Sequence, residues 1–152
     1  MAEQERASGP DHPGLADGLR ELGRLVHELR DLAAARTLLE RARLLHERTL
    51  GDEHPEVATD CNHLGLVLHD MGELDEAAAL FEQALAIDER ALGSRHQAVG
   101  RDANNLAGVL RDQGDVLAAR TALEWALDVY HATLGPDHPT TQSVARNLAL
   151  LD

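Results

Sequence analysis

The sequence predicts an all-α protein in which pairs of helices are stacked side by side. A short motif, Leu50-Gly51-Asp52-Glu53-His54-Pro55, returns every 42 residues, as residues 92–97 and 134–139, and a shorter copy occupies residues 9–13. Aromatic residues make up only 2% of the chain, so Leu, Ala and Val must fill the core, which suits helices better than strands. A fixed period of this length is typical of stacked copies of one small unit.

The N-terminal part is expected to contain a disordered leader and a first helix pair. Residues 1–8 are polar and contain no apolar signal core, so we predict that they form the leader. The first unit, residues 9–50, carries apolar residues at helical spacing. Arg30 stands where the later units have a turn glycine, so this turn is expected to differ. The residues expected to point inward are Leu15, Leu19, Leu22, Val26, Ala35, Leu39 and Ala42.

The second unit, residues 51–92, shows the pattern most clearly. Pro55 suits the first position of a helix, where its missing N–H costs nothing. Gly72 is expected to end that helix, because glycine readily adopts a positive φ. A second helix is predicted from about Leu74 to Ala91. The inward residues of the two helices are Val57, Cys61, Leu64, Leu68, Ala77, Leu80, Phe81, Ala84, Leu85 and Ile87.

The third unit, residues 93–134, repeats this pattern and is followed by one closing helix, residues 139–151. A lone helix that covers the apolar end of a stack is how such arrays stop. The alternative, that the chain is a piece of a longer array, stays open. Small residues recur where two helices would cross closely, which allows a short interaxial distance. They are Gly65, Ala107, Ala149, Ala35, Ala77 and Ala119.

Bulk properties exclude several classes of partner. The formal net charge is −13 and there is no Lys, which argues against binding to nucleic acid or to a membrane surface. No apolar run approaches the roughly 18 residues that a membrane-spanning helix needs. The single cysteine, Cys61, excludes an internal disulfide and fits a reducing compartment. A cytoplasmic location is therefore expected.

Nine histidines raise the question of a metal site. Four belong to the repeated links: His12, His54, His96 and His138. Equivalent residues of stacked helix pairs lie too far apart to share one ion, so we expect these side chains to pack and hydrogen-bond at helix starts. His27-Glu28 and His46-Glu47 lack the second His, four residues after the first, of a zinc-protease motif. No metal site and no cofactor are expected.

No catalytic constellation is apparent either. A phosphate-binding loop needs a Lys, and no Gly-x-Ser-x-Gly elbow occurs. Cys61 lies on the apolar face with Leu64 and Leu68, so a buried, inert thiol is expected rather than a nucleophile. The sequence therefore predicts a protein that is not an enzyme.

Three features make the chain similar to the tetratricopeptide-repeat family. Leu-small pairs such as Leu64-Gly65 lie in the first helices, a turn glycine such as Gly72 follows, and the second helices carry an Ala-large-Ala pattern, as in Ala77-Phe81-Ala84. The 42-residue unit with its Gly-x-x-His-Pro link resembles the kinesin-light-chain subtype. This resemblance, over residues 9–152, implies a right-handed superhelix of three helix pairs plus a closing helix, and a protein- or peptide-binding adaptor.

In that family the first helices line a concave groove. Arginine there would suit carboxylates, and Asn would clamp peptide N–H and C=O groups. The resemblance therefore implies an extended peptide ligand, with acidic side chains or a free carboxylate as the preferred chemistry. The alternative is that the arginines pair with Asp17, Asp70, Asp102 and Asp112 on the same face. The groove residues implied are Arg20, Arg24, Asn62, His69, Arg101, Asn104, Arg111 and Arg146.

Two other functions stay open at this stage. The chain could be the sensor part of a larger multidomain signalling protein. It could also be a self-assembly module that forms a homo-oligomer through its ends or through Trp125, an aromatic residue at a largely outward position. The alternative for Trp125 is a ring that folds flat over its own unit.

Overall fold

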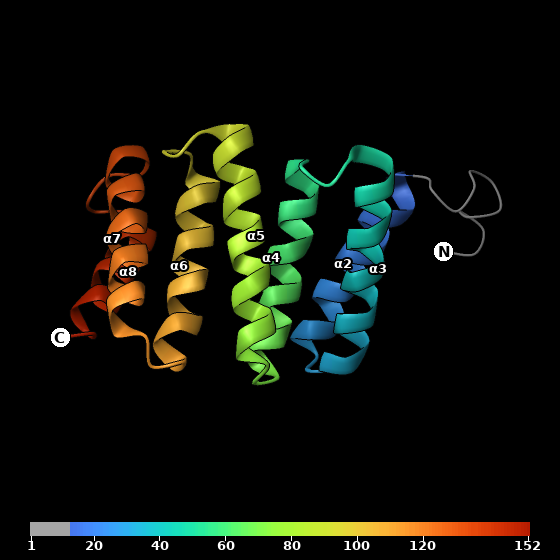
Figure 1. The fold of residues 1–152 in the computed structure, drawn as a ribbon, viewed down its shortest axis with the longest axis horizontal. Coiled ribbons are helices and arrows are strands. Elements are labelled where there is room, and N and C mark those ends of the chain that lie inside the picture. The colour runs from blue at the N-terminus through green and yellow to red at the C-terminus, as the bar shows by residue number, and fades with distance from the viewer. Residues whose placement is uncertain (1–12) are drawn as a thin grey trace.

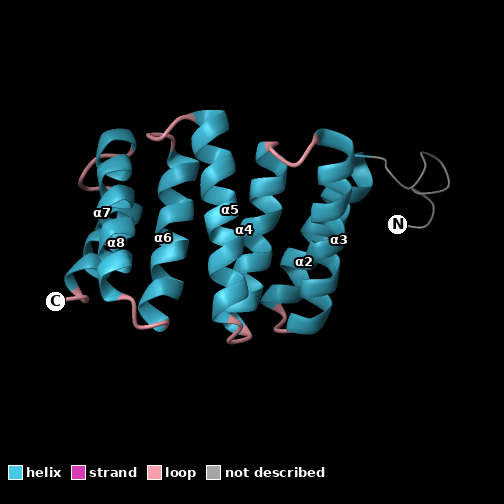
Figure 2. Cartoon of the chain, in the orientation of Figure 1, coloured by secondary structure: helices cyan, strands magenta, loops and turns pink. Residues whose placement is uncertain are grey.

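The computed structural model describes residues 13–152, and the predicted leader, His12 and the start of the first unit lie outside this range. Within the described residues the regular secondary structure is entirely helical, and short loops connect the helices (Figures 1 and 2). The helices are α2 (Pro13–Glu28), α3 (Leu32–Leu50), α4 (Pro55–Asp70), α5 (Leu74–Leu92), α6 (Gln97–Asp112), α7 (Val116–Thr133) and α8 (Pro139–Ala149). The all-helical prediction is therefore confirmed.

The helix pairs follow one another in chain order, with α2 and α3 at one end and α7 and α8 at the other (Figure 1). Each helix packs on the next one in sequence, and α4 also contacts both α2 and α6. The first helices of successive pairs are thus close neighbours. They form an inner layer, and α3, α5 and α7 lie outside it (Figure 1). Among the described residues, no helix is both long and apolar enough to cross a bilayer.

The repeated histidines begin the first helices, as expected. His54, His96 and His138 are N-cap residues with extended backbones. Each accepts, through Nδ1, a hydrogen bond from the backbone N–H two residues later, at 3.0, 3.0 and 3.1 Å. This bond satisfies one of the N–H groups that a helix start leaves without an intrahelical partner.

The turn within the first unit corrects one expectation. Arg30 adopts φ +67°, close to the +81° of Gly72 and the +87° of Gly114 at the equivalent positions. The turn therefore keeps the conformation of the other two units. Here a residue with a side chain occupies the left-handed region, which favours glycine.

Within residues 13–152, three clusters of buried apolar residues lie along the stack, and the cluster around the second unit contains Phe81. Phe81 is fully buried at its centre, and Val57, Leu64 and Leu68 pack with it. Leu22, which we expected to point inward, is 40% exposed, because no helix precedes α2 among the described residues to cover it. The apolar surface at this end extends to Leu25 and Leu29.

Candidate functional site

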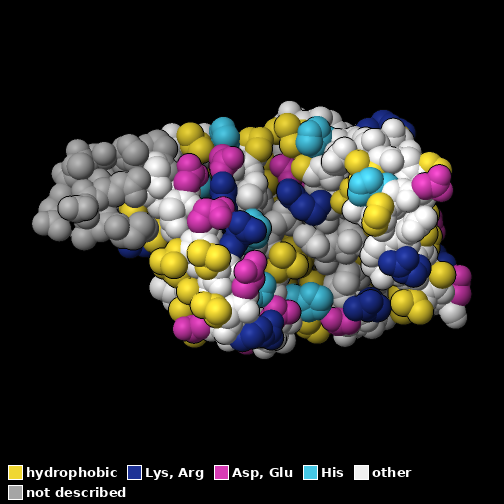
Figure 3. All heavy atoms as spheres, turned by 180° about the vertical axis from the view of Figure 1, so that it is seen from behind, with side chains coloured by type: hydrophobic (Ala, Val, Ile, Leu, Met, Phe, Trp, Pro, Cys, Tyr) yellow, Lys and Arg dark blue, Asp and Glu magenta, His cyan; other side chains and the backbone are white. Residues whose placement is uncertain are grey.

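The face formed by α2, α4, α6 and α8 carries most of the residues expected in a groove. Figure 3 views the molecule from behind, where basic, acidic and histidine side chains alternate rather than forming a patch of one sign. The reason is that most of the arginines have carboxylate partners on the same face. The alternative considered from the sequence, ion pairing along this face, therefore describes much of the surface.

All four aspartates named in that alternative lie within 4 Å of an arginine. Arg20 lies 3.8 Å from Asp17, and Arg30 bonds Asp70 at 3.0 Å. The other two pairs are Arg101–Asp102 at 3.4 Å and Arg111–Asp112 at 3.3 Å. Arginines paired in this way have less charge to offer an acidic ligand.

A buried polar network joins the second and third units and uses two of the expected groove residues. Asn62 donates to Asp102 Oδ1 at 2.5 Å and accepts from Asn105 at 3.3 Å, so its amide is engaged within the protein. Arg101 lies 3.5 Å from Asp88 and 3.4 Å from Asp102. Burial, together with the neighbouring Asp88, raises the pKa of Asp102 to about 8, so Asp102 holds a proton near neutral pH.

A small pocket opens between α6 and α8, with a volume of about 120 Å³. Asn104 and Arg111 line it, as does Asn147 of α8. Asn104 Oδ1 is a buried acceptor without a hydrogen-bond partner among the described residues. An unsatisfied buried acceptor is costly, so a ligand that donates a hydrogen bond here would be favoured.

The remaining groove residues do not converge on this pocket. Arg24 bonds Glu21 at 2.8 Å on its own helix, and His69 bonds Asp112 at 2.6 Å. Arg146 is exposed near the end of α8. His63 lies among the positive charges of this face. Burial and the nearby Arg24, Arg20 and Arg101 lower its pKa to about 4, so it is neutral near pH 7.

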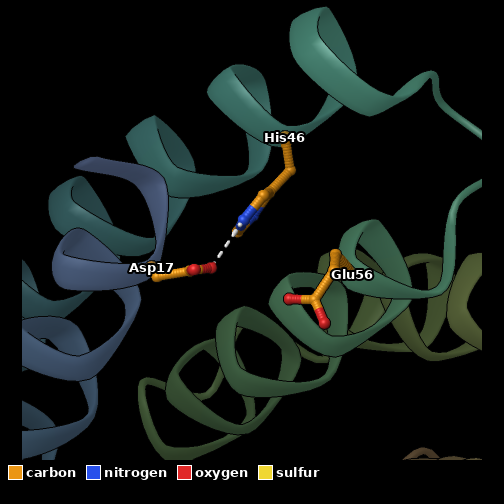
Figure 4. Close-up of side chains that lie close together, drawn as sticks. All are labelled: Asp17, His46 and Glu56. Carbon is orange, nitrogen blue, oxygen red and sulfur yellow. Dashed lines mark hydrogen bonds and ion pairs between the residues drawn. The ribbon is translucent and has the colours of Figure 1, made fainter. Parts of the chain in front are cut away.

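A second cluster lies where the first unit meets the second (Figure 4). His46 is buried, and its Nδ1 donates to the fully buried Asp60 at 2.5 Å. Its Nε2 lies 3.0 Å from Asp17 Oδ1, and Glu56 completes a group whose ligand atoms lie within 4.8 Å of one another. Burial opposes a charge on His46, but its hydrogen bonds to Asp60 and Asp17 outweigh this and raise its pKa.

Sequence reasoning missed this cluster because its members come from three helices, α2, α3 and α4. Asp17, His46 and Glu56 are 29 and 10 residues apart, so no motif connects them. The 42-residue period relates only equivalent positions of successive units, and Asp17, His46 and Glu56 are not equivalent positions. The one available signal was that a polar His interrupts the apolar face of the helix over residues 32–50.

Two single residues can now be placed. Trp125 is half-buried, and its indole N–H donates to the backbone oxygen of Ser94 at 3.2 Å, which favours the alternative of a ring held against its own unit.

Cys61 is fully buried, and burial raises its pKa to about 12. The expectation of a buried thiol is thus confirmed, and so high a pKa leaves little thiolate at neutral pH.

Comparisons with known proteins agree with this architecture. A model of the tetratricopeptide repeat matches residues 19–90, 59–130 and 101–152. No curated protein sequence matches the chain. Among solved structures, nearly identical TPR-like repeats assigned to a Podosopora anserina kinesin light chain share 28% identity at a TM-score of 0.84. That match covers 92% of this chain and 66% of the other.

Two further structures show the same fold at lower identity. BtubC (BKLC) from P. vanneervenii is 22% identical with a TM-score of 0.85, and the match covers 92% of this chain and 56% of the other. The N-terminal domain of stress-induced protein-1 from C. elegans is 14% identical with a TM-score of 0.69, over 91% and 95%. The chain thus spans about two thirds of the first of these three structures and just over half of the second.

Proposed function

The chain belongs to the tetratricopeptide-repeat family, and from this premise we propose that it binds an extended peptide segment of a partner protein along the face of α2, α4, α6 and α8. Folds of this kind are generally non-catalytic interaction scaffolds, but the fold alone does not specify the ligand. The assignment to this face must therefore come from its side chains.

The observation that carries the proposal is the pocket between α6 and α8. Asn104 offers an acceptor without a partner, and Asn147 and Arg111 add hydrogen-bond donors beside it. An extended peptide exposes backbone N–H and C=O groups at regular intervals, so side-chain amides on successive inner helices can bind it without reading its sequence. Shape and charge along the rest of the face would supply specificity.

The charge preference of the ligand is a narrower proposal. An acidic peptide or a free C-terminal carboxylate would bind near Arg111, Arg24 and Arg146, whose side chains are exposed. Arg20 contributes less, because it is largely buried between Glu56 and Asp60. We therefore expect a preference for carboxylates that is moderate and strongest toward the α8 end.

The proposal is tested by selecting short peptides from a displayed random library on the wild-type chain. The affinities of the selected peptides are then measured for an Asn104→Ala, Arg111→Ala double variant. The expected result is a loss of about tenfold or more, because truncating a few central contacts removes most of the binding energy of an interface. Amidated and free-acid forms of each peptide separate the carboxylate preference from peptide binding itself.

A matched control is the Gln83→Ala, Arg90→Ala double variant on α5, which removes one amide and one guanidinium away from the pocket. It should bind the selected peptides as the wild type does. Equal affinity of the wild type and the Asn104, Arg111 variant for every selected peptide would show that this pocket is not part of the binding face.

A further inference from the structure

We propose that Asp17, His46 and Glu56 form a binding site for one divalent ion of the zinc type, which connects the first helix pair to the second. The three residues come from α2, α3 and α4, and their side chains point into one space between these helices (Figure 4). The site is separate from the pocket between α6 and α8, so the inference does not depend on the proposed function.

The geometry of His46 supports a ligand role. Asp60 is fully buried and holds Nδ1 at 2.5 Å, which directs Nε2 toward Asp17 at 3.0 Å. A carboxylate behind a histidine that presents its other nitrogen to an ion is the usual second layer of a metal site, where it fixes the orientation of the ring. Asp17 and Glu56 are both partly exposed, so an ion can reach them from solvent.

The local charge also suits a divalent ion. With a neutral imidazole, the three carboxylates of Asp17, Glu56 and Asp60 and the one guanidinium of Arg20 leave a net charge of −2. Arg20 bonds Glu56 Oε2 at 2.7 Å and lies 3.4 Å from Asp60 Oδ1. Glu56 Oε1 therefore stays available to an ion on the other side of Glu56, and Asp17 Oδ1 becomes available when an ion takes the place of the proton between it and His46 Nε2.

The other units show that the repeat does not need this set of residues. The positions 42 residues later are Thr59, Asp88 and Ala98, which cannot form such a site. The positions 84 residues later are Arg101, Tyr130 and Thr140, which line an open pocket of about 460 Å³. Because consecutive helices pack on each other at all three junctions, the ligand set of the first junction is an addition to the fold.

The donor set selects the class of ion. One imidazole nitrogen and two carboxylates, with a position left for water, suit Zn²⁺, whereas Mg²⁺ and Ca²⁺ favour sites made of oxygen atoms. An ion bound there would join three helices of two units, so it would stabilise the native chain against unfolding.

The test is isothermal titration of Zn²⁺ into the chelator-treated full chain, for the wild type and for an Asp17→Asn, Glu56→Gln variant. The wild type should bind one ion at a site whose affinity falls by about tenfold or more in the variant. Zn²⁺ should also raise the melting temperature of the wild type but not of the variant. Both substitutions affect partly exposed side chains, and Asp17→Asn alone serves as the test if the double variant does not fold.

His69→Gln is the matched control, because His69 also pairs with an aspartate, Asp112, but belongs to no group of three ligands among the described residues. This variant should keep the tight site. With Co²⁺ in place of Zn²⁺, the wild type and the control should show the same visible absorption bands, and the Asp17, Glu56 variant should lose them. The proposal is overturned by a wild type that binds no Zn²⁺, by an unchanged site in the Asp17, Glu56 variant, or by its loss in the control.

Discussion

At the residue scale, the most informative positions are those where one unit has a different residue from the equivalent position of another unit. Arg30 takes the left-handed conformation of the turn glycines, and Asp88 and Asp102 bring two carboxyl groups together inside the stack. Equivalent positions in other units avoid the strained backbone and the close carboxyl pair. The turns there contain Gly72 and Gly114, and the third junction has Tyr130 and Val144. These comparisons within one chain lead to two predictions.

Replacing Arg30 by glycine should stabilise the protein. A residue with a Cβ in the left-handed region costs about 1–2 kcal/mol, part of which glycine returns through its greater freedom in the unfolded chain. The exposed Arg30–Asp70 pair that is lost contributes little. We expect an increase of about 0.5–1 kcal/mol in the free energy of unfolding, measured by urea denaturation at high salt, where that pair is screened. A decrease at high salt would show that the turn is not strained.

The buried aspartate pair should make stability depend on pH. The pKa of Asp102 is about 8 in the folded protein and near 3.8 in the unfolded chain, so the native state holds more protons between these values. The contribution of Asp102 to the free energy of unfolding is therefore most favourable below pH 4, and it becomes less favourable as the pH rises toward 8. The groups that face the pair are Asn62, Arg101 and Tyr130.

Asp102→Asn should remove that dependence, because the amide has the shape of the protonated acid and can still accept from Asn62. At pH 8 we expect the variant to be more stable than the wild type by at least about 1 kcal/mol, or about 2–4 °C in melting temperature. The difference between the two proteins should shrink steadily as the pH falls toward 4. A constant difference in melting temperature between the two proteins across this range would contradict a protonated Asp102 in the folded protein.

At the element scale, the distance between paired helices is set by one small and one large residue. A Cβ added at Gly65 would lie 2.7 Å from Phe81 Cε1, and one at Gly23 would lie 2.7 Å from Leu39 Cγ. The third unit has Ala107 and Leu123 at the positions of Gly65 and Phe81. Between the second and third units, the larger ring thus accompanies the smaller partner, as close packing of helices requires, whereas the first unit pairs Gly23 with Leu39.

Gly65→Ala should therefore overpack the crossing of α4 and α5 and cost about 1–3 kcal/mol. Combining it with Phe81→Leu recreates the pair of the third unit, so the double variant should be more stable than the sum of the two single changes predicts. A double-mutant cycle measured by urea denaturation gives this coupling energy. Additive changes in the free energy of unfolding would show that the sizes of the two side chains do not restrict each other.

At the scale of the whole molecule, the fold was predictable because the repeat supplies the same evidence several times. A helix predicted from about Leu74 to Ala91 is found at Leu74–Leu92, and the histidine caps recur in every described link. The division into a disordered leader, residues 1–8, and one repeat domain, residues 9–152, that includes the closing helix stays a prediction. The turn at Arg30 was harder to predict, because tertiary context overrode the residue's own preference.

The candidate sites were less predictable for a physical reason. Residues such as Arg101 and Asp102 are adjacent in sequence, but whether they pair or face a ligand depends on side-chain directions and on the neighbouring helix. Asn62 was expected in the groove and is instead engaged with Asp102 and Asn105. The His46 cluster depends on how three helices are rotated, which apolar spacing constrains only coarsely.

The most direct test of the central claim is an amide NMR titration of the labelled chain with a peptide selected from the library. Binding along the inner layer predicts that the largest shift changes fall on α4, α6 and α8, around Asn104, Arg111 and Asn147. Changes confined to α3, α5 and α7, or to the two ends of the array, would contradict it.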